Sequence, residues 1–548
     1  LFREGELFQG ETETASSHAG AVLRLDTRNG SEVILKVASS FISLEQAEWN
    51  LQNEIGPNGF DQIREIASTR WNTLLGRIKT EGGSHDQKCT FYTALYRTML
   101  FPRKFYETDT FGRIIHYSPY NGKICSGYMF TDNGFWDTFR AVFPFFTLMF
   151  PELNSQIMEG LVNTYLESGW LPEWASPGHR NCMIGSNSAS LIADSYLKGI
   201  RGYEIQTLYE ALIKNSENEG PLSSVGRLGV KWYNDLGYIP YDVGVRENTA
   251  RTLEYSYDDF TLWKLSQALG RPEKESNVFL ERAFHYRNVF DQETCFMRGR
   301  KRDGSFQTPF RPDKWGDAFT EGCSWHWTWC VFHDPAGLID LMGGEERFVG
   351  KLDSVFIAPP TFDDSYYGLQ IHEITEMLVM NMGQYAHGNQ PIQHMPYLYC
   401  YAGQPWKTQW RVRDIMNRLY LNAPDGLCGD EDNGQTSAWY VFSAMGFYPV
   451  CPGTGQYVMG SPLFDRMTLH LENGSSFVVD AKGNESHKPY IRNVFLNGKL
   501  LTANFISHSD ILCGGILECQ MDDTPNQRRG TQPQDLPYSL SREAEAPK

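Results

Sequence analysis

The chain has 548 residues, with 66 acidic against 49 basic side chains and a formal net charge of −17. This balance argues against a nucleic-acid partner, which needs a basic surface to displace counterions from phosphates, and it suits a neutral substrate. The chain is 41% hydrophobic and 14% aromatic, which excludes a disordered polymer and predicts two or three folding units. No apolar run reaches the roughly 18 residues of a membrane span.

The 11 cysteines are an odd number, and no two of them have CxxC spacing. This argues against a disulfide framework and against a zinc site. The first residues, LFREGELFQG, lack the basic start and apolar run of a signal peptide. The abrupt start leads us to expect that an upstream segment precedes them.

Strands are predicted first along the chain, and helices follow. Residues 20–40 alternate apolar and polar positions around a turn at Asn29-Gly30, which predicts a hairpin at the tail of a larger β-domain. Residues 44–55 and 60–78 carry apolar positions three and four apart, as helices do. We interpret residues 44–84 as a helical linker.

Helical patterns dominate residues 85–455, separated by loops rich in Gly, Pro, Asp, Asn and Trp. This alternation predicts a toroid of helix pairs whose loops at one end build a site, although an ordinary helical bundle also fits the composition. The clearest helical segments are SQIMEGLVNTYLE, SASLIADSYLKG, YDDFTLWKLSQAL, RFVGKLDSVF, IHEITEMLVMNM and SAWYVFSAMGF.

The pattern returns to strands over residues 456–522. Two hairpins are predicted there, with turns at Asn473-Gly474 and Asn497-Gly498. The remaining residues, 523–548, are polar and predict a loose tail.

The densest chemical signal is the stretch GDEDNGQTSAW, residues 429–439. Three acids lie in a Gly-flanked loop directly before a helix. Carboxylates packed so closely repel one another, which indicates a metal, a bound polyol or a functional role. A solvated acidic turn that caps the helix is the alternative. We favour function, because Trp439 and Tyr440 border the loop and a second acidic centre lies upstream.

That second centre is Glu321, which is followed by Trp325, His326, Trp327 and Trp329. Desolvation in such an apolar setting would raise the pKa of the carboxyl and keep it protonated, as a general acid must be. A glutamate favoured at a helix start is an equally good interpretation. A buried acid together with exposed carboxylates is the two-carboxylate pattern of glycoside hydrolysis.

A third signal is HGNQPIQH, residues 387–394. Asn389, Gln390 and Gln393 offer side-chain oxygens in a Gly/Pro-bounded loop, which suits a hard cation such as calcium, with a plain polar turn as the alternative. The 14 tryptophans add surfaces on which sugar rings can stack, although each fits a core position equally well. The candidates are Trp136, Trp170, Trp174 and Trp315.

Eight blocks occur in a fixed order along the chain: GFWDTFR, GWLPEW, GSNSAS, TEGCSWHWTW, HGNQP, AGQPWKTQ, GDEDNGQTSAWYVFSAMGFYPVCPG and MGSPLFD. With them the chain resembles glycoside hydrolase family 92 from about residue 30 to residue 520. The resemblance implies an inverting, Ca²⁺-dependent exo-α-mannosidase that acts on terminal, mainly α-1,2-linked residues of mannose-rich glycans. It implies an α+β fold with an (α/α)6 toroid and β-sandwich elements from both chain ends, of which residues 1–43 are an amino-terminal remnant. It also implies a secreted or periplasmic bacterial protein.

The resemblance further implies roles for single residues. Family members usually have Glu at position 390, so Gln390 departs from the pattern and supplies an oxygen without a charge. The implied roles are a general acid at Glu321, general bases at Asp430 and Asp432, calcium contacts at Asn389 and Gln390, recognition of the leaving mannose by His372 and Glu373, and substrate binding by Trp136 and Asp137. The alternatives are a carbohydrate-binding protein with altered catalysis and another toroid glycoside hydrolase or lyase.

Overall fold

The computed structural model describes residues 1–30 and 32–544. It contains two compact units, Leu1–Arg70 and Trp71–Lys548. The second unit contains all the residues predicted to carry chemistry, so it is described in more detail.

The first unit has little regular structure before residue 44. A small antiparallel sheet contains β1 (Phe2–Arg3) between β2 (Glu6–Leu7) and β3 (Ala19–Gly20), and a 3₁₀ turn covers Arg28–Gly30. The hairpin predicted for residues 20–40 is wrong, because the described part of that stretch contains no strand beyond β3. Alternation alone does not make a strand without a surface to pack on. The apolar side chains of this stretch are exposed, namely Val22, Leu23, Leu25, Val33, Ile34, Leu35 and Val37.

The helical periodicity after residue 44 is confirmed. Helix α1 (Leu44–Asn50) continues into a π turn (Leu51–Ile55), and α2 covers Phe60–Leu75. The Ser43 hydroxyl accepts a hydrogen bond from the Gln46 backbone N–H at 3.1 Å, which satisfies one of the free donors at the start of α1.

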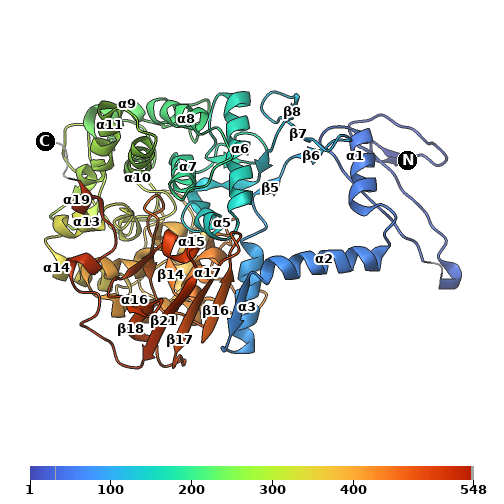
Figure 1. The fold of residues 1–548 in the computed structure, drawn as a ribbon. Coiled ribbons are helices and arrows are strands. Elements are labelled where there is room, and N and C mark those ends of the chain that lie inside the picture. The colour runs from blue at the N-terminus through green and yellow to red at the C-terminus, as the bar shows by residue number, and fades with distance from the viewer. Residues whose placement is uncertain (31, 545–548) are drawn as a thin grey trace. The chain divides into compact units, whose positions relative to one another are not determined.

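Helices dominate the second unit up to residue 445 (Figure 1), and all six predicted helical segments are confirmed. The helices are α3 (His85–Arg97), α4 (Phe135–Thr138), α5 (Val142–Met149), α6 (Pro151–Ser168), α7 (Ser188–Leu197), α8 (Ile205–Glu217), α9 (Val230–Leu236), α10 (Asn248–Ala268), α11 (Glu273–Ala283), α12 (Ser324–Trp327), α13 (Pro335–Leu341), α14 (Glu345–Val355), α15 (His372–Met380), α16 (Pro405–Leu419), α17 (Gln435–Met445), α18 (His508–Leu512) and α19 (Leu540–Glu543). Short 3₁₀ helices cover His285–Val289, Gln390–Ile392, Met395–Ala402 and Pro533–Asp535.

Several of these helices lie inside the core, among them α10 and α17. Every residue of α17 is buried, and α10 is buried on almost all sides, where it packs against α7 and α11. The polar side chains of a buried helix must find partners within the protein. In α10, Asp259 accepts a hydrogen bond from Arg227 at 2.8 Å and another from the Tyr233 hydroxyl at 2.9 Å.

The carboxy-terminal part of the second unit contains a six-stranded sheet in the order β19-β18-β21-β17-β16-β4 (Figure 1), in which β17 and β21 are parallel and the other pairs antiparallel. Both predicted hairpins are confirmed as β16/β17 and β18/β19. The predicted linker also supplies a strand, because β4 pairs with β16 at the edge of the sheet. The strands of this sheet are β4 (Ile78–Glu81), β16 (Arg466–His470), β17 (Ser476–Lys482), β18 (Tyr490–Leu496), β19 (Lys499–Leu500) and β21 (Gly515–Asp522).

Shorter strands connect the helices. β14, β15 and β20 form one three-stranded sheet, and β6, β7 and β8 form another. The bounds are β5 (Arg103–Lys104), β6 (Glu107–Thr108), β7 (Ile114–Tyr117), β8 (Ile124–Ser126), β9 (Phe130–Thr131), β10 (Asn133–Gly134), β11 (Trp174–Ala175), β12 (Phe290–Asp291), β13 (Phe296–Met297), β14 (Phe447–Tyr448), β15 (Gln456–Met459) and β20 (Phe505–Ser507).

The polar segment after residue 522 is not a loose tail over its described length. Leu540 is fully buried, and the Asp334 carboxylate accepts hydrogen bonds from the hydroxyls of Ser539 (2.8 Å) and Ser541 (2.5 Å). Polar composition predicted disorder here, but serine hydroxyls that donate hydrogen bonds to a buried carboxylate are themselves a reason to pack. Residues 545–548 lie outside the described part of the chain.

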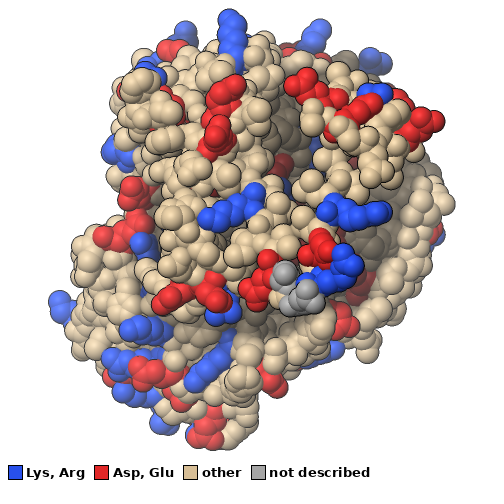
Figure 2. All heavy atoms as spheres, turned by 90° about the vertical axis from the view of Figure 1, so that its right-hand side faces the viewer, with Lys and Arg blue, Asp and Glu red and all other residues tan. Residues whose placement is uncertain are grey.

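Figure 2 shows acidic and basic side chains interspersed over the face it presents, without a broad basic patch. Among the described residues, no helix is both long and apolar enough to cross a bilayer.

Candidate active site

The predicted site residues come from loops and helix starts of the second unit. Asp137 lies in α4, Glu321 lies just before α12, and His372 begins α15. Gln390 begins a 3₁₀ helix, and Asp432 belongs to the loop before α17. Direct contacts or mutual charge effects connect all of these residues, so chain segments almost 300 residues apart supply one cluster of carboxylates.

Glu321 has strained backbone and an enclosed carboxyl. Its φ is +44°, a conformation that costs energy for any residue but glycine. Two contacts hold it: the Glu321 N–H donates to the Tyr367 hydroxyl at 3.0 Å, and the Asn389 side chain donates to the Glu321 carbonyl at 2.6 Å. Burial, followed by the negative charges of Glu373 and Asp432, raises the pKa of the carboxyl to about 8. The carboxyl therefore carries a proton at neutral pH.

The acidic loop, residues 429–434, gives its three acids three different surroundings. The Asp430 side chain is 67% exposed. Burial raises the pKa of Glu431 to about 7, and this carboxylate accepts a hydrogen bond from the Gly434 N–H at 2.8 Å just before α17. Burial also raises the pKa of Asp432 to about 6, although a hydrogen bond from the Gln390 amide opposes that rise. Asp432 has a φ of +51°.

The pair at the start of α15 connects the acidic loop to this helix. His372 lies 2.9 Å from Glu376, 3.3 Å from Glu373 and 3.8 Å from Asp430, measured between ring nitrogens and carboxylate oxygens. Partial burial acts to lower the pKa of His372, but these carboxylates outweigh it and the pKa is raised. Burial raises the pKa of Glu373.

The two residues predicted to contact a metal are buried beside Asp432. The Asn389 side-chain oxygen accepts a hydrogen bond from the Gln390 N–H at 3.0 Å, and its amide nitrogen holds the carbonyl of Glu321. The Gln390 amide nitrogen donates to Asp432. These two side chains thus connect the acid to the acidic loop.

Asp137 and Trp136 are neighbours in α4, and Asp137 is within reach of the charges of this cluster. Burial, followed by the charges of Asp432 and Glu321, raises the pKa of Asp137 well above its ordinary value. One of its carboxyl oxygens is buried and has no hydrogen-bond partner in the part of the chain that the structure describes. The Trp136 ring is fully buried and stacks on Trp327, with 6.4 Å between ring centroids.

The other tryptophan candidates divide by exposure. Trp315 is fully buried and packs edge-to-face against His326, so it belongs to the core. Trp170 and Trp174 are half-buried. The Trp174 ring lies directly against Gly134 of β10, where an added Cβ would come within 2.4 Å of the indole.

Sequence reasoning missed two residues of the cluster. Glu376 follows His372 by one helical turn, so the spacing of four residues in a predicted helix was a usable signal. Tyr367, which supports Glu321, lies in a loop without any local pattern.

The donor set of the cluster fits a hard cation. It is rich in carboxylate and amide oxygens, which calcium prefers as ligands. Buried carboxylate oxygens of Asp137, Glu373 and Glu376 have no hydrogen-bond partner among the described residues. Unpaired buried acceptors of this kind are costly, and a cation or the hydroxyls of a polyol would satisfy them.

A family model described as the glycosyl hydrolase family 92 catalytic domain matches residues 46–523. Among solved structures, a family GH92 inverting mannosidase from Bacteroides thetaiotaomicron VPI-5482 is 52% identical, with a TM-score of 0.86 over 92% of this chain and 68% of that one. A GH92 α-mannosidase from Bacteroides thetaiotaomicron, in complex with mannoimidazole, is 32% identical with a TM-score of 0.83, over 91% of this chain and 64% of its own.

A curated relative, an uncharacterized secreted glycosidase of Arthroderma benhamiae, is 29% identical over 564 residues. The match covers 95% of this chain and 65% of that relative's length.

Proposed function

The chain belongs to glycoside hydrolase family 92, and from that premise we propose that it is an inverting exo-α-mannosidase. One observation carries the proposal: within a single cluster the pKa of Glu321 is raised to about 8 and that of Asp432 only to about 6. Two carboxyl groups whose surroundings separate their pKa values in this way can act as acid and base at the same neutral pH.

Glu321 is the proposed general acid. Its protonated carboxyl would give its proton to the glycosidic oxygen as the bond to the anomeric carbon breaks. The contacts from Tyr367 and Asn389 fix the backbone on both sides of the carboxyl group. They keep the acid at one position in spite of its left-handed backbone.

Asp432 and Asp430 are the proposed general bases. They would hold a water molecule and remove its proton while it attacks the anomeric carbon from the face opposite Glu321. Asp432 is largely ionised at neutral pH, and the Gln390 amide bonds to the carboxylate and supports this charged form. Asp430 is exposed, so it can exchange water with the solvent.

Asn389 and Gln390 are the proposed contacts of a calcium ion beside Asp432. Such an ion would offset the negative charge of the surrounding carboxylates. By binding mannose hydroxyls it would favour a more planar geometry of the mannose ring. Gln390 supplies an amide oxygen without a charge, so the carboxylates of the cluster must provide the negative charge that attracts the cation.

The remaining residues are proposed to recognise sugars. One buried carboxyl oxygen of Asp137 has no hydrogen-bond partner among the described residues, so this side chain can hydrogen-bond hydroxyls of the reacting mannose. Trp136, its neighbour in the chain, is fully buried and would help to fix its position. His372 and Glu373 would contact the leaving mannose of an α-1,2 linkage, since they begin α15, where the exposed His372 ring lies next to Asp430 and the buried Glu373 carboxylate.

The wider proposals follow from family membership. The helices between residues 85 and 455 would form an (α/α)6 toroid, with β-sandwich elements from residues 1–43 and 456–522. The substrate would be a mannose-rich glycan, and the protein would act as a secreted or periplasmic enzyme of a bacterium.

One comparison of substrates tests the proposal. The chain should hydrolyse aryl α-mannosides but not aryl glucosides, and exhaustive chelation should abolish the activity until calcium is restored. Glucoside hydrolysis would reject the substrate class. Full activity after chelation would remove the cation from the mechanism.

A further inference from the structure

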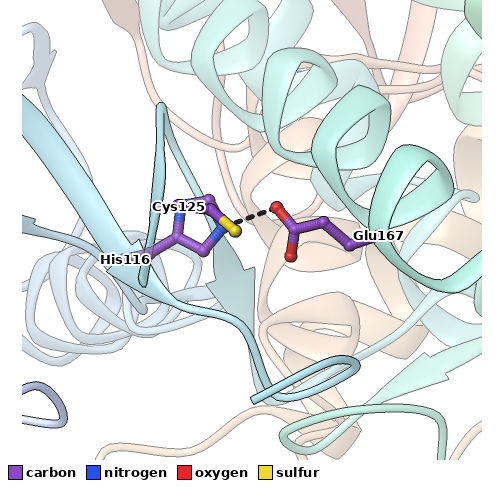
Figure 3. Close-up of side chains that lie close together, drawn as sticks. All are labelled: His116, Cys125 and Glu167. Atoms are coloured by element: carbon purple, nitrogen blue, oxygen red, sulfur yellow. Dashed lines mark hydrogen bonds and ion pairs between the residues drawn. The ribbon is translucent and has the colours of Figure 1, made fainter. Parts of the chain in front are cut away.

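A second group of potential metal ligands lies away from the candidate active site, where the β7/β8 hairpin meets α6 (Figure 3). His116 in β7 and Cys125 in β8 are direct cross-strand partners, so their side chains lie on one face of the hairpin. Glu167, in the last turn of α6, points toward both. The three ligand atoms, one from each side chain, all lie within 4.8 Å of one another.

The histidine ring is held as metal-binding histidines usually are. Its Nδ1 lies 2.8 Å from the carbonyl oxygen of Gly127, a distance at which Nδ1 carries the proton and donates it. The other nitrogen, Nε2, therefore faces Glu167 Oε1, also at 2.8 Å. A ring nitrogen bonded to a backbone carbonyl fixes the tautomer and aims the opposite nitrogen at a ligand position.

The carboxylate has unused binding capacity. Glu167 Oε2 is buried and has no partner at hydrogen-bond distance and angle within the described chain. Next to it, the Cys125 sulfur lies within 4.8 Å of the ligand atoms of Glu167 and His116.

We propose that His116, Cys125 and Glu167 bind a divalent metal ion of the zinc class. Imidazole nitrogen, thiolate sulfur and carboxylate oxygen are the three protein ligand types of zinc. Binding would displace two protons, one from the thiol and one from between His116 Nε2 and Glu167. Cys125 is only half-buried, so a water molecule can complete a tetrahedral site from that side.

An ion at this position would fasten the hairpin to α6, and a chain of contacts links the turn of the hairpin to the segment that carries Asp137. Tyr120, in the turn between β7 and β8, packs on His179 with 4.8 Å between ring centroids. His179 belongs to the loop that follows β11, and β11 pairs with β10 directly before α4 and Asp137. The ion would therefore stabilise a support of the sugar site without contacting substrate.

The chain offers a matched control. Cys89 and His85 also lie close together, at 3.4 Å, but His85 is exposed, Cys89 is half-buried, and both lie outside the two candidate metal groups. The other candidate group, His372, Glu376 and Asp430, contains no thiol. A thiolate signature therefore separates the proposed zinc site from a cation at the active site.

The test uses the full chain after removal of metals by a chelator. Cobalt(II), titrated as a probe, should give a thiolate-to-cobalt charge-transfer band that saturates at one ion per chain. Cys125→Ser should abolish the band, whereas Cys89→Ser should leave it unchanged. By calorimetry, zinc should bind at least tenfold more weakly to Glu167→Gln and Cys125→Ser than to the parent chain.

A missing band, or a band that survives in Cys125→Ser, would overturn the proposal. The conservative Cys125→Ser change alters a half-buried side chain by one atom, so it decides the matter even if Glu167→Gln does not fold. Mannosidase activity is not the readout, and failure here would leave the proposed function untouched.

Discussion

Glu321 and the acidic loop both bring carboxyl groups into the candidate active site, but their surroundings differ. Glu321 is a single acid whose burial raises its pKa to about 8. The acidic loop places three acids in sequence and separates them by exposure: Asp430 is exposed, and burial raises the pKa of Glu431 to about 7 and that of Asp432 to about 6. Residue type alone therefore does not assign a chemical role, because the solvation of each carboxyl decides it.

The largest expected effect concerns the isolated acid. Glu321→Gln should reduce kcat/KM on α-1,2-mannobiose by about 10²–10⁴-fold, the usual contribution of general acid catalysis. The loss should be much smaller for an aryl mannoside with a good leaving group, which needs no protonation. Steady-state kinetics on the two substrates measure the difference. Equal losses on the two substrates would show that Glu321 has a structural role and is not the general acid.

Within the acidic loop, substitutions of the neighbouring acids Asp432 and Glu431 should have different effects. Asp432→Asn should lower kcat by about 10²–10³-fold, because it removes a general base. Glu431→Gln makes the same change of charge one residue earlier, but its partner is the Gly434 N–H at the start of α17. We expect it to lower the thermal midpoint more than the turnover. A larger loss of turnover in Glu431→Gln would exchange the two assignments.

The pH dependence of the activity tests the roles of Glu321 and Asp432 together. Turnover requires Glu321 protonated, which holds below pH 8, and Asp432 ionised, which holds above pH 6. The plot of kcat/KM against pH should therefore be bell-shaped and fall about tenfold per pH unit beyond each limit. Glu321→Gln should lose the alkaline limb and keep the acid limb. An acid limb that disappears in this variant would reverse the roles.

A smaller effect is expected at the start of α15. Replacing His372 and Glu373 together with Ala should reduce activity on α-1,2-mannobiose by about tenfold, the value of one or two polar contacts to the leaving sugar. Activity on an aryl mannoside should change little, because no second mannose is present. Equal losses on the two substrates would indicate that His372 and Glu373 contact the reacting mannose instead of the leaving one.

The smallest effect should come from Gln390, which lies between the Glu321 region and the acidic loop. Gln390→Glu adds charge next to Asp432, which should tighten calcium binding severalfold by calorimetry. Without calcium the same change removes the amide donor and should raise the pKa of Asp432 further, which moves the acid limb to higher pH. Gln370→Glu, in an exposed loop, is the control for added charge. Weaker calcium binding in Gln390→Glu would show that residue 390 does not contact the ion.

Much of the site could be predicted from the sequence because it depends on local chemistry. The acidic loop before a helix and a glutamate among tryptophans are visible as patterns, and the raised pKa of Glu321 agrees with the desolvation expected there. The left-handed backbone at Glu321 and Asp432 was not predictable, since neither is a glycine. The approach of His372 to Asp430 and the support from Tyr367 depend on tertiary contacts that leave no local signal.

The incorrect predictions have a common physical cause. Alternation over residues 20–40 records which side chains are apolar, but a strand also needs a partner, and none is present there among the described residues. In the carboxy-terminal segment, polar composition hid the bonds from Ser539 and Ser541 to Asp334. The cysteine count and spacing argued against a zinc site, and this stays a prediction. A spacing rule cannot detect a group such as His116, Cys125 and Glu167, which the hairpin and α6 bring together.

The pairing of β4 with β16 has a consequence for the order of folding. Ile78 faces Leu469 across this ladder, so the first strand of the six-stranded sheet waits for one that is synthesised almost 400 residues later. Contacts of such sequence separation slow folding, because the loop must close before they contribute. During translation α3 leaves the ribosome early, without the sheet beside it. The sheet can be completed only after nearly the whole described chain has emerged.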